Sequence, residues 1–300
     1  MALATSPNVA KTLSRLSNSE LTEAINRLGP WYYKLHVRDG IFTGSDSQVD
    51  DDGRTVAFVD PVANFEYFTK QALPNGMEGR SFLDCGCNCG GYSFAAKERG
   101  AGKVYAFDVR DHWIDQAKFL LENREQNAED MRFEVADLVG ANNIDEEFDV
   151  TWFCGLFYHL PDPVAGLKLA ADKTKELLFL QTAVVGSEPG EEEYPSLDYK
   201  KEGIKASMSG IYGLSWLPSG PKVLKGILDC LGFPETRTVM WYRKNIGYGA
   251  RSRGRVMIIA ARERGRLKGV RNAEPIDSRI DPRSPEFGGI STPDNSVPNW

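Results

Sequence analysis

A glycine-rich stretch, SFLDCGCNCGGYSF (residues 81–94), holds the residue types with the clearest capacity for chemistry. Cys85, Cys87 and Cys89 stand at alternate positions, and thiolates can bind a metal or take part in redox reactions. Structural zinc sites usually use cysteines with two to four residues between them, whereas here only one lies between neighbours, and alternating residues at a strand end point to opposite sides. We therefore predict packed, reduced thiols and no metal site.

The glycines of the same stretch predict a turn that binds a ligand. Gly86, Gly90 and Gly91 let the backbone turn sharply after a strand and approach a bound molecule closely. A dinucleotide fingerprint would need a glycine where Asn88 stands, which disfavours a nicotinamide-binding oxidoreductase without excluding it.

The chain that must position this turn alternates short apolar runs with helical patterns from about residue 80. Such alternation indicates crossover connections and a parallel sheet covered on both faces, the α/β class. The last two apolar runs, TRTVMWYR (236–243) and GRVMIIAAR (254–262), are joined by a loop too short for a crossover helix. These two strands must therefore be antiparallel.

Three regions follow from these patterns: a helical cap over residues 1–75, a main domain over 76–265 and a flexible tail over 266–300. The cap contains a capping box, Ser17 with Glu20, and its helix should end at Gly29-Pro30. A second helix is expected over 64–73. The tail has five prolines and few large apolar residues, which predicts little packing.

Composition predicts a soluble cytoplasmic protein. The 300 residues are 41% hydrophobic and 26% charged, which suits an ordinary globular core. The first residues lack an apolar run of signal-peptide length, and no segment approaches the roughly 20 apolar residues needed to span a bilayer. The five cysteines form no framework typical of secreted proteins, so reduced thiols are expected.

The sequence FLDCGCNCGG resembles the first motif of the class I S-adenosylmethionine-dependent methyltransferases: hydrophobic, Asp, x, Gly, x, Gly or Asn, x, Gly. FDVTWFCGLFYHLPDP, LFLQTAV, SWLPSGPKVLKGILDCLGF and, in the cap, LGPWYYKLHVRDGIFTG resemble the branch of the tRNA wobble-uridine methyl- and carboxymethyltransferases. The resemblance covers about residues 20–262. It implies a Rossmann-like seven-stranded methyltransferase sheet, parallel with one antiparallel strand, with an N-terminal cap.

The resemblance also implies that S-adenosylmethionine binds at the carboxyl ends of three successive strands, where open α/β sheets bind ligands. Asp84 and the loop to Gly90 would hold the methionine end, Asp108 the ribose hydroxyls and Asp137 the adenine. Asp108 could instead cap a turn, and Asp137 a helix. The implied cofactor residues are Asp84, Gly86, Asn88, Gly90, Asp108, Val109, Asp137 and Leu138.

Tyr158 and His159, in FYHLPDP, follow the fourth strand, at a place that faces the transferring methyl group in the resembled family. His159 is the chain's best-placed candidate for a general base, and the alternative is a structural histidine that fixes the loop. Tyr158 could donate a hydrogen bond to the acceptor or place its ring against the sulfonium.

Charge is distributed unevenly and bears on the acceptor. The formal net charge is −6, yet residues 243–271 hold ten Lys or Arg and one Glu. Arg251, Arg253 and Arg255 should border the acceptor site from the loop that joins the last two strands, while the acidic insertion that contains residues 191–193 should open onto the same face. This pairing favours a compact, anionic acceptor (a small molecule, lipid or sugar) or a locally read RNA loop over duplex nucleic acid.

Other functions remain open. A tRNA wobble-uridine methyl- or carboxymethyltransferase fits the resembled branch, and the carboxymethyl version would use carboxy-S-adenosylmethionine. The resemblance then assigns the extra carboxylate to Lys34, Tyr158 and Arg255. A catalytically silent nucleotide-binding module is the alternative of another class.

Overall fold

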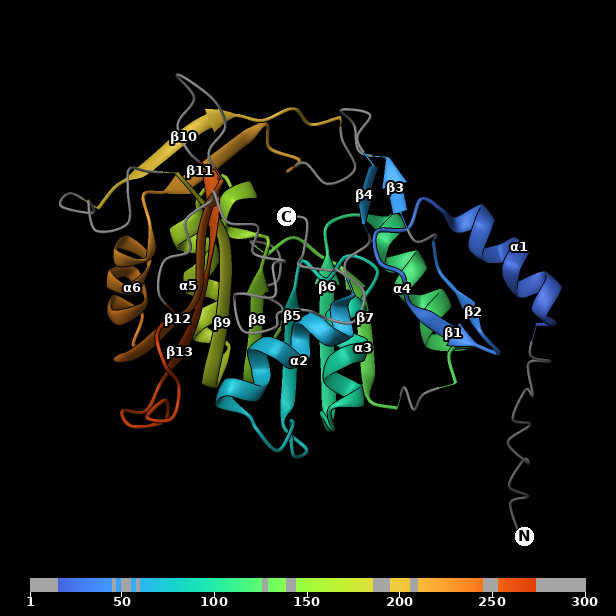
Figure 1. Cartoon of the computed structure of the whole chain (residues 1–300), viewed down its shortest axis with the longest axis horizontal. Helices are drawn as coiled ribbons and strands as arrows, with labels where there is room; N and C mark the ends of the chain where they lie inside the picture. The colour runs from blue at the N-terminus through green and yellow to red at the C-terminus, as the bar shows by residue number, and fades with distance from the viewer. Residues whose placement is uncertain are drawn as a thin grey trace, which may run out of the picture.

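The computed structural model describes residues 16–44, 47–49, 55–57, 60–125, 129–138, 144–185, 195–205, 210–244 and 253–273. Its centre is a seven-stranded sheet of order β12-β13-β9-β8-β5-β6-β7 (Figure 1). The strands are β5 Ser81–Cys85, β6 Lys103–Asp108, β7 Met131–Val135, β8 Phe148–Cys154, β9 Thr174–Val185, β12 Glu235–Lys244 and β13 Arg253–Ala261. β13 runs antiparallel to β9 and β12, and the other neighbours in the sheet are parallel. The predicted sheet, parallel with one antiparallel strand, is confirmed.

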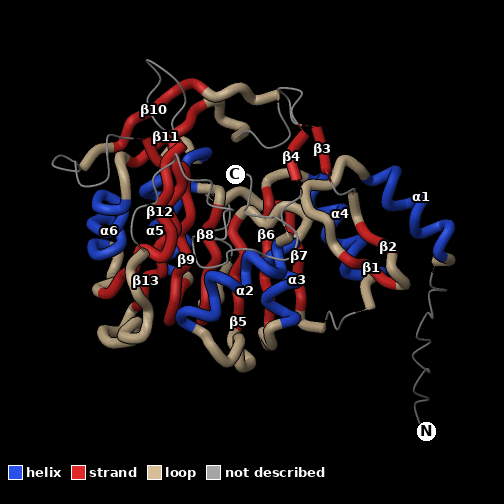
Figure 2. The backbone as a smooth tube through the Cα atoms, viewed as in Figure 1, coloured by secondary structure: helices blue, strands red, loops and turns tan. Residues whose placement is uncertain are grey.

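Helices cover both faces of this sheet, as Figures 1 and 2 show. Helices α2 (Pro61–Ala72), α3 (Gly91–Glu98) and α4 (Asp111–Asn123) contribute to one apolar cluster, and α5 (Pro163–Asp172) and α6 (Pro221–Cys230) contribute to the other. Successive side chains of β5 alternate between the two: Phe82 belongs to the first cluster and Leu83 to the second. Because both faces are buried, the central strands are mostly apolar, and Asp84 in β5 is an exception.

The N-terminal cap begins with helix α1 (Asn18–Leu28). The predicted capping box is present: the Ser17 hydroxyl accepts from the Glu20 amide at 3.3 Å, and the Glu20 carboxylate accepts from the Ser17 amide at 2.8 Å. Strand pairs β1 (His36–Arg38) with β2 (Ile41–Phe42) and β3 (Ser47–Val49) with β4 (Thr55–Ala57) follow. Trp31 joins the first apolar cluster, which fixes the cap to the sheet domain.

The helix expected over 64–73 is α2, which starts three residues earlier, at Pro61. The Asp60 carboxylate caps it by accepting from the amides of Val62 at 2.9 Å and Ala63 at 3.1 Å. Proline in the first turn costs nothing there, since that amide has no partner within the helix. This local capping chemistry decides where the helix begins.

The insertion after β9 contains a second small sheet. Strands β10 (Leu197–Lys201) and β11 (Leu214–Pro218) pair antiparallel and lie above the upper edge of the main sheet in Figure 1. The indole nitrogen of Trp216 donates to the Pro161 carbonyl at 3.0 Å, which ties β11 to the loop after β8. The acidic residues 191–193 lie outside the described residues.

Packing continues past residue 265, where the sequence placed the start of the tail. Leu267 is fully buried, Val270 is buried, and the Ala273 amide donates to the Thr238 carbonyl at 2.7 Å. Two apolar side chains are enough to hold residues 266–273 against the domain. Residues 274–300 lie outside the described part of the chain. Among the described helices, none is long and apolar enough to cross a membrane.

Candidate active site

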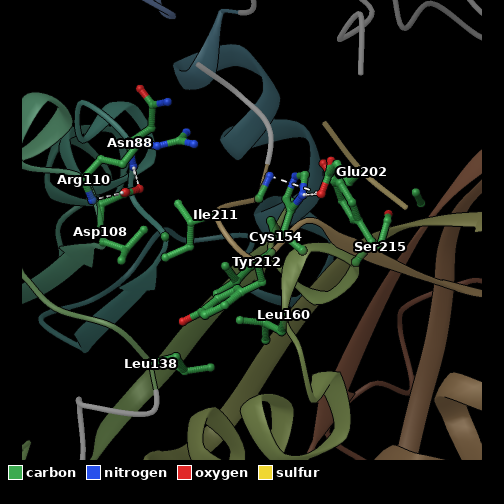
Figure 3. A pocket seen from close by; sticks show the side chains of 18 of the residues that line it. Asn88, Asp108, Arg110, Leu138, Cys154, Leu160, Glu202, Ile211, Tyr212 and Ser215 are labelled. Carbon is green, nitrogen blue, oxygen red and sulfur yellow. Dashed lines mark hydrogen bonds and ion pairs between the residues drawn. The ribbon is translucent and has the colours of Figure 1, made fainter. Parts of the chain in front are cut away.

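A cavity of about 600 Å³ lies at the carboxyl ends of the parallel strands, within the size range of small-molecule sites. Strand ends β5, β6, β8 and β9 form its floor, the cap contributes Tyr32 and Tyr33, and the insertion contributes Lys200, Glu202 and Tyr212. In Figure 3, Asp108 and Glu202 lie at opposite ends, with Tyr212 between them.

The turn after β5 has the backbone that its glycines predict. Gly86, Asn88 and Gly90 have φ values of 71°, 52° and 83°, all in the left-handed region. Asparagine tolerates this region better than most residues, which explains Asn88 at a position where a glycine is common. A Cβ on Gly90 would lie 2.8 Å from the Phe133 ring, so glycine is also needed there for space.

Asp108, at the end of β6, forms one wall of the cavity. Its carboxylate accepts from the Asn88 amide at 2.9 Å and from the Arg110 amide at 3.0 Å. Burial raises its pKa, and these backbone donors oppose that rise. The bonds fix an acceptor group that can take further hydrogen bonds from a diol. Val109, which follows, also lines the cavity.

Asp137 and Leu138 line the same end of the cavity, after β7. The Tyr212 hydroxyl, from the insertion, donates to the Asp137 carboxylate. Burial and this bond raise the pKa of Tyr212 to about 12, so the phenol remains protonated. This hydrogen bond joins the insertion to the part of the cavity that the ends of β6 and β7 form.

Asp84 and Gly90 do not line the cavity but lie behind its wall. Asp84 is 1% exposed and accepts from the Ser93 hydroxyl at 2.6 Å. Burial raises the pKa of this carboxyl to about 7, against the opposing effect of the Ser93 bond. A group so placed can exchange a proton near neutral pH.

Tyr158 and His159 lie in a short 3-10 helix, η2 (Phe157–His159), and both line the cavity. The His159 Nδ1 atom is 2.9 Å from Glu202 Oε2. The Arg255 guanidinium, near the start of β13, lies 4.7 Å from the centre of the Tyr158 ring. The structure thus brings Tyr158, His159 and Arg255 close together. From the sequence, all three are predicted to lie beside the acceptor site.

The other predicted cations lie differently. Lys34 is not in the cavity wall, and its Nζ atom lies 5.1 Å from the centre of the Phe42 ring, in the β1–β2 pair. Its neighbours Tyr32 and Tyr33 line the cavity instead. Arg253 opens β13 opposite Val185, and Arg251 lies outside the described residues.

The cysteines of the turn are core residues. Cys85 belongs to one apolar cluster, and Cys87 and Cys89 belong to the other. Burial raises the pKa of each thiol, that of Cys89 to about 12, so all three stay protonated. In the described part of the chain, no group of three His, Cys, Asp or Glu side chains is placed to hold a metal.

Sequence reasoning missed the cavity residues contributed by the cap and the insertion. They include Tyr32, Tyr33, Lys200, Glu202 and Tyr212. In PWYYKLH only the lysine was assigned a role, and the part of the insertion that holds Lys200, Glu202 and Tyr212 carries no motif. Their roles depend on how two segments, distant in sequence, close over the same strand ends.

Comparison with known proteins identifies the domain. Residues 82–176 match a family described as a methyltransferase domain. A tRNA U34 carboxymethyltransferase of Campylobacter hominis is 28% identical over 130 residues, 42% of this chain and 44% of the relative. The corresponding Helicobacter pylori protein is 28% identical over 221 residues, 71% of this chain and 73% of that one. For the Campylobacter relatives, the match spans about half of their length.

Among solved structures, the N-terminal domain of EvdMO1, determined in the presence of SAH and D-fucose, superposes with a TM-score of 0.61. It is 22% identical, and the match covers 83% of this chain and 98% of that one. This likeness confirms the fold. The family match identifies residues 82–176 as a methyltransferase domain, as the resemblance in the sequence indicated.

Proposed function

We propose that this protein transfers a methyl group from S-adenosylmethionine to a compact acceptor held beneath the insertion. The observation that carries the proposal is the closure of the cavity. Tyr32 and Tyr33 from the cap, and Lys200 and Glu202 from the insertion, add walls above the strand ends. A cavity of about 600 Å³ that also holds the cofactor leaves room for a small acceptor rather than a duplex.

The residues present suit the cofactor. The two oxygens of Asp108 suit the ribose diol, Asp137 and the backbone at Leu138 suit adenine, and the turn from Gly86 to Asn88, with Asp84 behind it, suits the amino acid end. Gly90 shapes that turn, and Val109 offers an apolar surface beside Asp108. When bound, the cofactor supplies an activated methyl group. The protein then has only to bind, orient and accept a proton.

The acceptor end favours a small polar molecule. Arg255, stacked on Tyr158, supports an anionic or sugar-like acceptor, and Arg251 and Arg253 precede it in the same basic segment. The structurally similar EvdMO1 domain was crystallised in the presence of D-fucose, which supports the sugar class. Tyr158 and His159 would contact the reacting atom.

The second candidate is modification of tRNA at U34, supported by the names of the curated relatives. A carboxymethyl reaction would require carboxy-S-adenosylmethionine, and the Arg255–Tyr158 pair could hold its carboxylate. Lys34, outside the cavity wall, gives this alternative no support. A tRNA substrate would place the protein in the cytoplasm.

Two measurements test the proposal. Calorimetry with S-adenosylhomocysteine, carboxy-S-adenosylmethionine and NAD identifies the cofactor; tight binding of NAD alone would refute a methyltransferase. Labelled methyl transfer to cell extract, divided into RNA and small-molecule fractions, then identifies the acceptor class. Label in the small-molecule fraction supports the first candidate, label in RNA the second. Binding without transfer to either fraction supports a catalytically silent module.

A further inference from the structure

The insertion places a carboxylate directly against the candidate base. Glu202 Oε2 lies 2.9 Å from His159 Nδ1 and accepts from the Gly210 amide at 3.2 Å. Both side chains are 15% exposed, and both residues line the cavity. Glu202 and Gly210 belong to the insertion, whereas His159 lies in the loop after β8. The two segments are distant in sequence and meet only in the folded protein.

The Glu202 carboxylate determines which ring nitrogen of His159 carries the hydrogen. An ionised carboxylate only accepts hydrogen bonds, so His159 Nδ1 must be the donor. In the neutral imidazole the other nitrogen, Nε2, then has the lone pair that can take a proton. This assignment of the tautomer follows from the hydrogen-bond partners of the ring and the carboxylate.

Gly210 makes the contact possible. A Cβ at this position would lie 2.9 Å from Glu202 Oε2 and 3.0 Å from both Cβ and Nδ1 of His159. Any side chain there would have to displace the Glu202 carboxylate or the His159 ring. The backbone of residue 210 therefore both donates to the carboxylate and leaves the space that the pair occupies.

The surrounding charges show why a carboxylate is useful there. Arg255 lies over Tyr158, the Tyr158 ring centre is 4.0 Å from that of His159, and Lys200 also lines the cavity. Proton transfer to His159 during the reaction would add a positive charge to a cavity that already holds these two cations. The Glu202 carboxylate, in contact with the ring, would compensate that charge.

We propose that Glu202 is a positioning residue that makes His159 the general base, and that the methylated atom is a hydroxyl oxygen. This inference rests on the proposed function. Methylating a neutral hydroxyl without a base would leave a strongly acidic oxonium ion, whereas a carboxylate acceptor has no proton to lose. In the step, the acceptor oxygen bonds to the methyl carbon, the C–S bond breaks with its electron pair going to sulfur, and the hydroxyl proton goes to His159 Nε2.

The first test needs no acceptor. ¹⁵N NMR of His159 in the full-length protein, free and with S-adenosylhomocysteine, reports the tautomer. Wild type and Glu202→Gln, which keeps an acceptor oxygen, should carry hydrogen on Nδ1, whereas Glu202→Leu should show mixed tautomers. Hydrogen on Nε2 in the wild type would overturn the inference. If S-adenosylhomocysteine fails to bind, the proposed function fails, but the spectrum of the free protein still tests the pair.

The second test measures transfer of labelled methyl to the two extract fractions. Glu202→Leu should lower the maximal rate on the order of 10²-fold, the lower end of what a general base contributes, with little change in the half-saturating extract concentration. Glu202→Gln should recover part of that rate, and Asp198→Asn, which changes a carboxylate of β10 outside the cavity wall, should match wild type. An equal loss in Gln and Leu variants, or a change confined to half-saturation, would count against the positioning role.

The stability of the transferred methyl group in alkali separates a hydroxyl acceptor from a carboxylate acceptor. A methyl ether resists alkali and a methyl ester does not, so the label should survive alkaline treatment. The fraction that carries it separates a small hydroxylated molecule from a hydroxylated RNA base. Alkali-labile label as the main product would refute the hydroxyl assignment.

Discussion

The two ends of the cavity are built in different ways. At the cofactor end, Gly86, Asn88 and Asp108 come from one stretch of strand, turn, helix and strand, and backbone amides hold the Asp108 carboxylate. The acceptor end is assembled from separate segments, and contacts between side chains join them: His159 with Glu202, and Arg255 with Tyr158.

This difference separates cofactor binding from acceptor choice. Backbone geometry fixed by the sheet gives the cofactor end little freedom to vary, because changing it would disturb the strands themselves. The insertion contacts the sheet domain mainly through side chains and loops, as in the contacts of Trp216 with Pro161 and Tyr212 with Asp137. An insertion attached in this way can change its side chains without altering the fold beneath it.

The largest expected effect concerns Asp84, buried beneath the cofactor end. Its pKa is about 7 in the folded state against a usual 3.8, so the folded protein binds more protons than the unfolded one. Protonated Asp84 therefore stabilises the folded state fully below pH 3.8, the pKa of this carboxyl in the unfolded chain. This stabilisation is lost progressively as the pH rises to about 7. The change corresponds to up to ~4 kcal/mol of unfolding free energy.

Urea unfolding of wild type and Asp84→Asn between pH 4 and pH 8 measures this effect. Wild type should lose stability relative to the variant as pH rises. If the free energy of unfolding depends on pH in the same way for the two proteins, burial does not keep Asp84 protonated. The cofactor end would then be less rigid than its backbone hydrogen bonds imply.

The next effect is on cofactor affinity. Asp108→Ala removes the fixed acceptor at the end of β6 and should weaken S-adenosylhomocysteine binding by roughly 1.5 to 3 kcal/mol, the scale of hydrogen bonds to a charged group. Asp111→Ala, which removes an exposed carboxylate in the first turn of α4, is the matched control and should bind normally. Unchanged calorimetric affinity in Asp108→Ala would exclude this residue from the cofactor site.

A smaller effect is expected where the two ends meet. Tyr212→Phe removes the hydrogen bond to Asp137 and should lower the local stability of the insertion by about 1 kcal/mol. Amides in residues 210–218 should then exchange hydrogen roughly fivefold faster. Affinity for S-adenosylhomocysteine should change less than the exchange rate. If affinity falls as far as in Asp108→Ala, the insertion belongs to the cofactor end and the division into two ends is wrong.

The smallest effect is predicted for Lys34. Because its ammonium group lies at the Phe42 ring rather than in the cavity wall, Lys34→Met should change binding of plain or carboxylated cofactor by less than ~0.5 kcal/mol. Arg255→Met should change the ratio of the two affinities if Arg255 holds a carboxylate. A selective loss of carboxy-S-adenosylmethionine in Lys34→Met would bring Lys34 into the site.

The sequence by itself determined the sheet, its single antiparallel strand and the strand-end positions of Asp108 and Asp137. These features follow from short-range rules: apolar runs of strand length, a loop too short for a crossover helix, and glycines at left-handed turn positions. Carboxyl ends of parallel strands must meet at one edge, so residues there become neighbours whatever the rest of the chain does.

Only the tertiary structure decided which residues of the cap and the insertion complete the acceptor end. Glu202 and Tyr212 belong to no motif, and their partners lie 43 and 75 residues away in the chain. Lys34 and Tyr33 are adjacent in sequence, yet only the tyrosine lines the cavity. Such placements depend on how the cap and the insertion pack over the sheet, and long-range packing leaves no periodic pattern in the sequence of either segment.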